Sequence, residues 1–395
     1  MAKAKNIALT GGATGGHIYP CLAVAEAIIE EKPRSKLFYI GHQDKLEAEL
    51  LNNEDLTDGQ NRAYSNYIKF LGLEAEPLPR SKNPLAYLSF VWKFWSSVQL
   101  ASRYLKENKI DVVFGTGGYV AGPAFAAAIL NKIPYIIHNL DAHMGLANRF
   151  FVKDAAVLTL GFPDLEDLRS EVKSGKVEHT GNPVSSKFIS VIASDSEAIQ
   201  TGSPRRFAPR DDNRKIKLLI TGGSQGAQSI NEAIASILPQ LADNPQLNII
   251  HVTGAKLYDD YVEKHLDGKA DKYSNYKVIA YTHQMPKLCA NADIAICRSG
   301  AMTIAEMVAS QVVPIFIPLP WAAHDHQTLN AQSLVNESAA IMIKQNDPEF
   351  AQRILDCLNK LIGDREMLQY MQNKLADLAK PDAANKLAEL VLGLK

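Results

Sequence analysis

Three short apolar runs in this sequence each end in a glycine-rich segment, and a helix-like pattern follows each one. A strand, a glycine turn and a helix in succession point backbone N–H groups and the positive end of a helix dipole at whatever lies above the sheet. Two such loops in the first half and one in the second predict a protein that binds phosphate groups from both sides of a cleft. The segments are Gly11-Gly-Ala-Thr-Gly-Gly-His17, Gly115-Thr-Gly-Gly-Tyr-Val-Ala-Gly-Pro123 and Gly222-Gly-Ser-Gln-Gly-Ala-Gln228.

Neither of the two commonest nucleotide-binding motifs explains these loops. The spacing of Gly11, Gly15 and Gly16 does not fit G-x-G-x-x-G. The next strand, Leu37–Ile40, ends in Gly41-His42, where a dinucleotide-binding protein would carry a ribose-binding acid. No loop ends in the Gly-Lys-Ser/Thr of a P-loop. A lone glycine-rich turn is about as often a tight connection as a ligand site, so the loops alone leave the ligand open.

The first half of the chain alternates strand and helix patterns. Such alternation predicts an α/β fold with a parallel sheet, right-handed crossovers and helices on both faces. The predicted strands are Ile7–Thr10, Leu37–Ile40, Asp111–Phe114 and Pro134–Ile137. One helix is predicted to begin near Pro20, and three others are predicted at about 45–51, 84–108 and 124–130.

A polar, proline-bearing segment at about 190–214 precedes a second alternation, which indicates two doubly wound domains facing a central cleft. The 395 residues also suit two domains of roughly 150–200 residues each. We therefore expect an N-terminal domain over 1–188, a linker over 189–215, a C-terminal domain over 216–378, and a helical tail over 379–395 that packs back on the N-terminal domain. The second-half strands are predicted at 217–221, 247–252, 277–281, 294–297 and 313–317, with helices over about 229–241 and from Thr303.

Composition excludes several classes of protein. The net charge of −1 argues against a nucleic-acid binder, which would carry a basic excess. No apolar run reaches the roughly 18 residues of a membrane span, and Met1–Lys5 leads directly into the first strand without a signal peptide. The four cysteines form no C-x-x-C pair. These features predict a protein of the reducing cytoplasm.

The glycine loops, taken with three further segments, resemble the MurG family of N-acetylglucosaminyltransferases. The matching segments follow the family order from about residue 7 to residue 340. They are Gly11–Pro20, Gly117–Pro123, Thr180-Gly-Asn-Pro-Val184, Gly222–Ala227, Cys297-Arg-Ser-Gly-Ala-Met-Thr-Ile-Ala-Glu306 and His324-Asp-His-Gln-Thr-Leu-Asn-Ala331.

The resemblance implies a GT-B fold, UDP-N-acetylglucosamine as donor, and the membrane-bound lipid I (undecaprenyl-pyrophosphoryl-MurNAc-pentapeptide) as acceptor, giving lipid II in peptidoglycan synthesis. It implies no cofactor and no metal. The acceptor diphosphate is expected at Gly15, Gly16, Gly117, Gly118 and Tyr119. Donor contacts are expected at Thr14, Gly15, Gly16, Asp141, Ser224, Thr282, Ala301, Met302, Thr303, Ile304, Ala305, Glu306, Gln327 and Asn330.

An inverting sugar transfer needs a base for the incoming hydroxyl and charge stabilisation for the departing diphosphate. His17 titrates near neutrality and is the candidate catalytic base, with simple positioning of the diphosphate as an equal alternative. Glu306, in the first turn of its expected helix, is the candidate acceptor for ribose hydroxyls; the alternative is an ordinary surface glutamate. His324-Asp-His326 lacks further partners at metal-ligand spacing, and helix termini can carry the diphosphate charge.

The sequence departs from the family pattern at two places. MurG proteins usually read His-Glu-Gln-Asn where this chain has His138-Asn-Leu-Asp141, and usually have an arginine where it has Ser185. Both changes would alter contacts to the sugar or the nucleotide.

The segment Pro84–Trp95 interleaves aromatic and basic side chains. Apolar anchors beside cations suit a helix lying in an anionic membrane interface, which predicts a peripheral protein on the inner face of the cell membrane. The alternative is a buried core helix. The apolar stripe comprises Leu85, Leu88, Val91, Trp92 and Trp95, and the cations are Arg80, Lys82 and Lys93.

Three other functions remain open from the sequence. One is another GT-B glycosyltransferase with a lipid acceptor, such as a glycosyl-diacylglycerol synthase. A UDP-sugar epimerase of the same fold and a non-catalytic UDP-sugar binder are the others. Cell-wall synthesis proteins are the expected protein partners.

Overall fold

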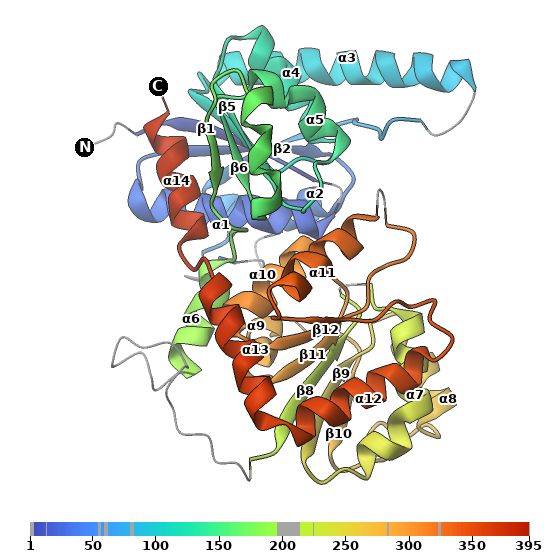
Figure 1. The fold of residues 1–395 in the computed structure, drawn as a ribbon. Helices are drawn as coiled ribbons and strands as arrows, with labels where there is room; N and C mark the ends of the chain where they lie inside the picture. The colour runs from blue at the N-terminus through green and yellow to red at the C-terminus, as the bar shows by residue number, and fades with distance from the viewer. Residues whose placement is uncertain are drawn as a thin grey trace. The chain divides into compact units, whose positions relative to one another are not determined.

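The chain forms two units, described here from a computed structural model (Figure 1). The structure describes residues 4–12, 14–53, 57–58, 62–79, 83–195, 214–223, 225–282, 284–322 and 325–394. Unit 1 comprises residues 1–187 and 380–395, and unit 2 comprises residues 188–379. Among the described residues, no helix combines the length and the apolar character needed to cross a membrane.

Unit 1 is built on a seven-stranded parallel sheet in the order β3-β2-β1-β4-β5-β6-β7. The order reverses between β1 and β4, so the loops after these two strands meet at one edge of the sheet. The strands are β1 Asn6–Thr10, β2 Lys36–His42, β3 Ile68–Leu73, β4 Val112–Gly115, β5 Tyr135–Asn139, β6 Val157–Leu160 and β7 Val177–His179.

Helices cover both faces of this sheet. Alternate residues of β1 point to opposite sides: Ile7 and Leu9 pack into a core with α1 and α14, whereas Ala8 packs with α3 and α4. The helices are α1 Gly15–Glu31, α2 Leu46–Asn52, α3 Pro84–Glu107, α4 Ala121–Leu130, α5 Leu146–Phe151 and α14 Ala383–Gly393, with short 3₁₀ turns at Tyr64–Asn66, Val152–Asp154 and Pro163–Glu171. The helix α6, Ser186–Asp195, begins at the last two residues of this part of unit 1 and continues into unit 2.

Unit 2 repeats this design with a six-stranded parallel sheet in the order β10-β9-β8-β11-β12-β13. Its strands are β8 Ile216–Thr221, β9 Leu247–Val252, β10 Tyr276–Ile279, β11 Ile294–Cys297, β12 Val313–Phe316 and β13 Ile341–Met342. Its helices are α7 Gln228–Ala242, α8 Tyr258–His265, α9 Met285–Asn291, α10 Ala301–Ser310, α11 His326–Asn336, α12 Phe350–Gly363 and α13 Arg365–Leu378.

The start of α1 differs from the prediction. The helix begins at Gly15, and Pro20 lies inside it rather than in its first turn. Pro20 cannot donate to the carbonyl of Gly16, but Gly16 is exposed, so solvent can serve that carbonyl. The earlier start brings the glycines and His17 themselves into the first turn of the helix.

Only part of α3 packs in the core. Its C-terminal half buries Val98, Ala101 and Leu105 against α4 and the sheet. Its first turns extend beyond the sheet (Figure 1). The C-terminal half of α3 thus packs in the core, whereas the apolar residues of its first turns are exposed.

Candidate active site

The first glycine loop joins β1 to the N-terminus of α1. Thr14 is the N-cap residue and makes no side-chain capping bond, and Thr14 and Gly16 are exposed. Gly12 lies against the buried carboxylate of Glu47: a β-carbon on Gly12 would come within 2.3 Å of Glu47 Oε1. The helix α1 thus starts from an exposed N-cap residue, and a helix start at the surface can bind an anion.

His17 lies where this loop meets the loop after β4. Its Nδ1 is 3.1 Å from the carbonyl oxygen of Thr116, whose hydroxyl donates to the His17 carbonyl at 2.7 Å. Because a carbonyl oxygen only accepts, Nδ1 carries the proton, and in the neutral ring Nε2 carries the lone pair. A β-carbon on Gly118 would lie 3.4 Å from the His17 ring. Two of the predicted loops thus come together around the candidate base.

The loop after β4 uses glycine for conformation as well as space. Gly117 and Gly118 have φ of +96° and +78°, in the left-handed region that favours glycine. A β-carbon on Gly117 would also collide with the side-chain amide of Asn148. Tyr119 follows, and burial together with the charge of Glu47 raises the pKa of its phenol.

The altered motif at 138–141 follows β5. His138 is fully buried between Thr159 Oγ1 and Asn182 Oδ1, both at 3.0 Å, and desolvation lowers its pKa to about 4. It is therefore a neutral structural residue. Asn139 donates to the Asp141 carbonyl at 2.7 Å, which fixes the turn that carries the predicted donor contact Asp141.

In unit 2 the glycine loop lies between β8 and α7. Gly226 has φ +75°, and a β-carbon there would come within 2.2 Å of the Thr253 carbonyl oxygen. Only glycine lets the chain turn here and begin α7 at Gln228. Ser224, predicted to contact the donor, lies outside the described residues.

The N-terminus of α10 forms the second helix start on this sheet edge. Ser299 is buried, and its hydroxyl donates to the Gln327 carbonyl at 2.8 Å. The Gln327 side chain accepts from Leu319 N at 3.0 Å, and Asn330 donates to the Ser299 carbonyl at 3.2 Å. In this structure Gln327 and the buried Asn330 hold the α10 loop. Their contact with sugar hydroxyls stays a prediction.

The predicted donor residues of α10 differ in exposure. Ala301 and Ile304 are buried, whereas Met302, Thr303 and Ala305 are partly exposed beside Glu306. Thr282, from the loop after β10, is partly exposed and accepts a hydrogen bond from Gln284 N at 2.9 Å.

Glu306 occupies the second turn of α10, so its predicted place in the first turn is wrong. The helix begins at Ala301, two residues before the Thr303 start expected from the sequence. The residue is partly exposed, and desolvation of its carboxyl raises the pKa to about 7. Burial raises the pKa of the nearby thiols of Cys289 and Cys297, and the charge of Glu306 raises it further. No described residue forms a hydrogen bond with this carboxyl.

Arg298 is a candidate that the sequence reasoning missed. Its guanidinium donates to the carbonyls of Ile317 and Pro318 at 3.0 and 3.3 Å, and to Ser229 Oγ and Gln345 Oε1 at 3.1 and 2.8 Å. All four acceptors are neutral, and no described carboxylate pairs with it. The sequence could have identified Arg298 from its position directly after β11, in a Cys-Arg-Ser-Gly turn. A partly buried cation beside the first turn of α7 suits a phosphate.

No metal centre is assigned to this region. Within the described ranges, no three His, Cys, Asp or Glu side chains are grouped as metal ligands would be. His324, part of the His-Asp-His motif, lies outside those ranges.

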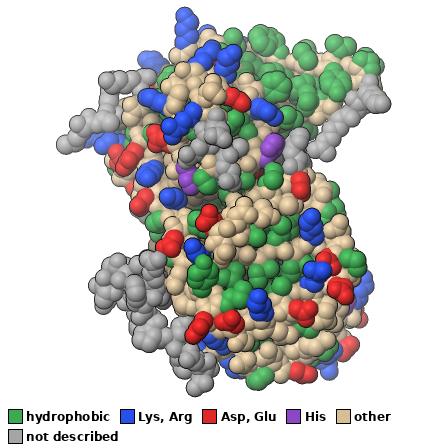
Figure 2. Space-filling model, viewed as in Figure 1, with side chains coloured by type: hydrophobic (Ala, Val, Ile, Leu, Met, Phe, Trp, Pro, Cys, Tyr) green, Lys and Arg blue, Asp and Glu red, His purple; other side chains and the backbone are tan. Residues whose placement is uncertain are grey.

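The apolar stripe of α3 lies at the surface, so the alternative of a buried core helix is wrong for this half. Its members are 52–70% exposed, and hydrophobic side chains gather along α3 in Figure 2. Phe150 of α5 is also exposed. Lys93 pairs with Glu76, and Arg80 and Lys82 lie outside the described residues. The stripe comprises Leu85, Leu88, Val91, Trp92 and Trp95.

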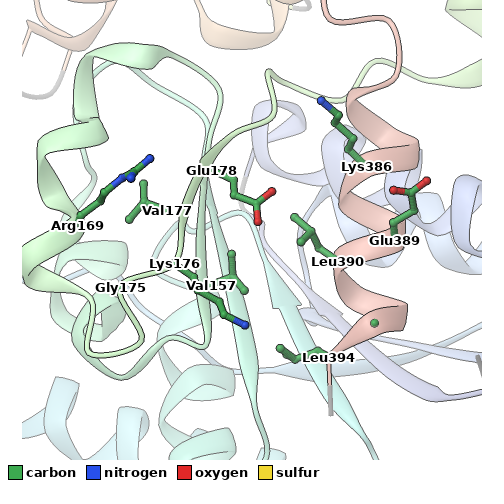
Figure 3. Close-up of a pocket in the computed structure, with 11 residues that line it drawn as sticks. Val157, Arg169, Gly175, Lys176, Val177, Glu178, Lys386, Glu389, Leu390 and Leu394 are labelled. Atoms are coloured by element: carbon green, nitrogen blue, oxygen red, sulfur yellow. The ribbon is translucent and has the colours of Figure 1, made fainter.

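A surface pocket of about 550 Å³ lies elsewhere in unit 1, between α14 and the amino ends of β6 and β7 (Figure 3). Lys176 and Glu178 come from β7 and the turn before it, and Lys386 and Leu390 come from α14. None of the predicted site residues lines this pocket, and the glycine loops lie at the carboxyl ends of the strands.

The comparisons with known proteins agree with this geometry. Residues 7–158 match the glycosyltransferase family 28 N-terminal domain, and residues 217–387 match the C-terminal domain of the same family. The chain therefore belongs to glycosyltransferase family 28, and the predicted fold class, two Rossmann-like units of the GT-B type, is confirmed.

Within this family the chain is similar to UDP-N-acetylglucosamine--N-acetylmuramyl-(pentapeptide) pyrophosphoryl-undecaprenol N-acetylglucosamine transferases. The relative from Halothermothrix orenii is 35% identical over 98% of each chain, and that from Bacillus pumilus is 34% identical over 96% of this chain and 97% of its own. The predicted resemblance to MurG is confirmed.

Solved structures give the same result. The crystal structure of Acinetobacter baumannii MurG is 27% identical, covers 99% of this chain and 100% of its own, and superposes with a TM-score of 0.73. A UDP-GlcNAc 2-epimerase from Neisseria meningitidis bound to UDP-GlcNAc, 15% identical over 99% and 100% of the two chains, has a TM-score of 0.61. The second likeness shows the fold alone.

Proposed function

We propose that this protein transfers N-acetylglucosamine from UDP-N-acetylglucosamine to lipid I, with inversion at the anomeric carbon, and so forms lipid II. The observation that carries the proposal is the near full-length match to transferases of that name, at 35% identity in H. orenii. Unit 1 would then bind the acceptor, and unit 2 the donor.

His17 acts in this scheme as the base. Its Nδ1 proton is engaged by Thr116 O at 3.1 Å, so Nε2 of the neutral ring takes the proton from the acceptor hydroxyl as that oxygen attacks. The bond from the sugar to the UDP oxygen breaks as the new glycosidic bond forms. The N-terminus of α1 and the glycines after β4 hold the acceptor diphosphate.

The leaving UDP is stabilised by unit 2. The N-termini of α7 and α10 supply N–H groups for its phosphates, and Arg298 supplies a positive charge that no described carboxylate neutralises. Glu306 accepts hydrogen bonds from the ribose hydroxyls.

Membrane attachment forms the third part of the proposal. The exposed stripe of α3 inserts among lipid headgroups, with Trp92 and Trp95 at the interface. This places the protein at the inner face of the cell membrane, where its lipid-linked acceptor is held.

One experiment tests the reaction. Labelled UDP-N-acetylglucosamine is incubated with a short-chain lipid I analogue, and the products are separated by chromatography. The expected product is the lipid-linked disaccharide, absent when either substrate is omitted. Transfer to diacylglycerol instead would indicate a glycosyl-diacylglycerol synthase. Epimerised UDP-sugar without an acceptor would indicate an epimerase, and donor binding with no product a non-catalytic binder.

A further inference from the structure

We propose that Thr116 is a positioning residue that fixes the tautomer of His17 and holds the ring for proton transfer. The inference rests on the proposed role of His17 as base. It concerns a residue that touches neither substrate and acts only through His17.

Thr116 binds His17 at two points. Its carbonyl oxygen accepts from Nδ1 of the ring at 3.1 Å, and its hydroxyl donates to the backbone carbonyl of His17 at 2.7 Å. Its own N–H donates to Thr10 O at 3.0 Å, which ties it to the end of β1. One residue of the β4 loop thus sets both the backbone and the ring of a residue in α1.

The packing leaves Thr116 little room to move. It is fully buried, and a β-carbon on Gly11 would lie 2.2 Å from its hydroxyl oxygen. Cys21 Sγ is 3.5 Å from the same oxygen. The hydroxyl therefore has a defined direction toward the His17 carbonyl.

This arrangement selects one of the two neutral forms of the imidazole. A proton on Nε2 would place the Nδ1 lone pair against the lone pairs of the Thr116 carbonyl, which is repulsive. The Nδ1–H form instead gains a hydrogen bond and leaves the lone pair on Nε2, the atom that must accept the proton. A hydrogen bond of ordinary net strength changes such an equilibrium by about 3- to 10-fold.

Three variants separate positioning from simple packing. Thr116→Val keeps the shape and the carbonyl but removes the hydroxyl that holds the His17 backbone. Thr116→Ser restores a hydroxyl. Thr10→Val is the matched control, because the equally buried Thr10 hydroxyl donates to Ile40 O at 3.0 Å and does not contact His17.

The full chain of each variant is compared by two measurements. One is kcat and KM with the soluble lipid I analogue; the other is the ¹⁵N chemical shifts of the labelled His17 ring above its titration range. We expect Nδ1–H in the wild type. In Thr116→Val the hydroxyl no longer holds the His17 backbone, so the ring can move away from the Thr116 carbonyl. We therefore expect a mixture of tautomers in this variant and a loss of kcat of about 3- to 10-fold, with little change in donor KM. Thr116→Ser should recover both, and Thr10→Val should resemble the wild type.

Several results would overturn the inference. An Nε2–H tautomer in the wild type does so even if Thr116→Val fails to fold, as does a Thr116→Val enzyme with unchanged kcat. A fall in kcat with an unchanged tautomer, or an equal fall in Thr10→Val, would indicate packing alone. Wild-type turnover in His17→Ala would instead remove the base from the proposed function, while the ¹⁵N result would still report on the tautomer.

Discussion

Glu26 in α1 accepts two hydrogen bonds from Ser186, the first residue of α6: one from the backbone N at 3.1 Å and one from the hydroxyl at 2.6 Å. The hydroxyl of Tyr64 donates to the same carboxylate at 2.6 Å. Glu26 is only 2% exposed, and burial raises its pKa despite these three donors. A buried acid thus fixes the start of the helix through which the chain leaves unit 1.

Glu26→Ala should destabilise unit 1 by about 2–5 kcal/mol, because the Tyr64 and Ser186 donors lose a buried acceptor. Calorimetry measures the loss, and Glu26→Gln, which keeps an acceptor, should lose less. The folded pKa of Glu26 lies above its unfolded value, so the stability that this carboxyl contributes is fully present below the ordinary pKa of 4.5 and is lost as pH rises through the folded pKa. The Gln variant should lack this component; an identical pH dependence would contradict the assignment.

Glu306 should make nucleoside binding depend on pH. Only the ionised carboxylate accepts from both ribose hydroxyls, and its pKa is raised to about 7. Affinity for uridine, which has no phosphate that titrates, should therefore rise about tenfold between pH 6 and pH 8. NMR titration measures it, with the exposed Glu263→Gln as a control that should behave like the wild type. A flat profile in the wild type, or a persistent slope in Glu306→Gln, would exclude Glu306.

The same carboxyl should lower the stability of the unliganded protein as pH rises, whereas the affinity for uridine should increase. Its folded pKa exceeds the ordinary value of 4.5, so the stability that this carboxyl contributes is fully present below about 4.5 and is lost as pH rises through about 7. Glu306→Ala should weaken UDP binding by roughly tenfold to hundredfold, from the loss of about 1.5–3 kcal/mol of charged hydrogen bonding. Calorimetric titration measures this loss, and unchanged UDP affinity would refute it.

Arg298→Ala should weaken UDP binding more than uridine binding. The guanidinium contributes a charge that only the diphosphate can use, and a charge-assisted hydrogen bond is worth about 1.5–3 kcal/mol, or roughly 10- to 100-fold in affinity. Comparing the two ligands on one variant separates this effect from any general damage to the site. Equal losses for UDP and uridine would show that Arg298 only supports the fold through its four neutral acceptors.

His17→Ala should lower kcat by about 10²–10⁴-fold, as expected for loss of a general base, with little change in donor affinity. Steady-state kinetics with the soluble acceptor, together with UDP titration, measure both quantities. Turnover close to the wild type across pH 6–9 would remove His17 from the catalytic role and leave it the diphosphate-positioning role.

Replacing Trp92 and Trp95 by serine should abolish binding to anionic vesicles and activity on a long-chain acceptor, yet retain activity on a short-chain one. Both side chains are exposed, at 70% and 52%, so the change should not disturb the core. Trp321→Ser, with a tryptophan 72% exposed in unit 2, is the matched control and should bind vesicles normally. Vesicle sedimentation measures this, and wild-type binding by the double variant would place the membrane face elsewhere.

Buried strands followed by glycine were readable in the sequence, because apolar runs and glycine turns are local signals. Ile294–Cys297 and Leu247–Val252 were predicted with their observed bounds. The two-residue β13 was not, since so short a segment has no pattern and becomes a strand only beside β12. The sequence misplaces the start of α1, because proline is typical of a first helical turn, whereas Pro20 lies inside this helix.

Partnerships between distant residues lay beyond the sequence. The motif containing Arg298 was recognised, but its contact with Gln345 depends on the fold of unit 2. The bonds between His17 and Thr116 likewise join residues 99 positions apart. The sequence identifies His17 as a base candidate, whereas only the structure places the Thr116 carbonyl beside Nδ1, from which the tautomer is inferred.

The helix α14 has a consequence for how the protein is made. Leu387 and Val391 are buried in the core that Ile7, Leu9 and α1 also build, although the whole of unit 2 is encoded between them. A ribosome therefore synthesises unit 2 before the core of unit 1 can close. Until α14 is synthesised, one side of the unit 1 sheet stays incompletely covered, whereas all strands and helices of unit 2 are already available. We therefore expect the domain that is synthesised first to be the one that finishes folding last.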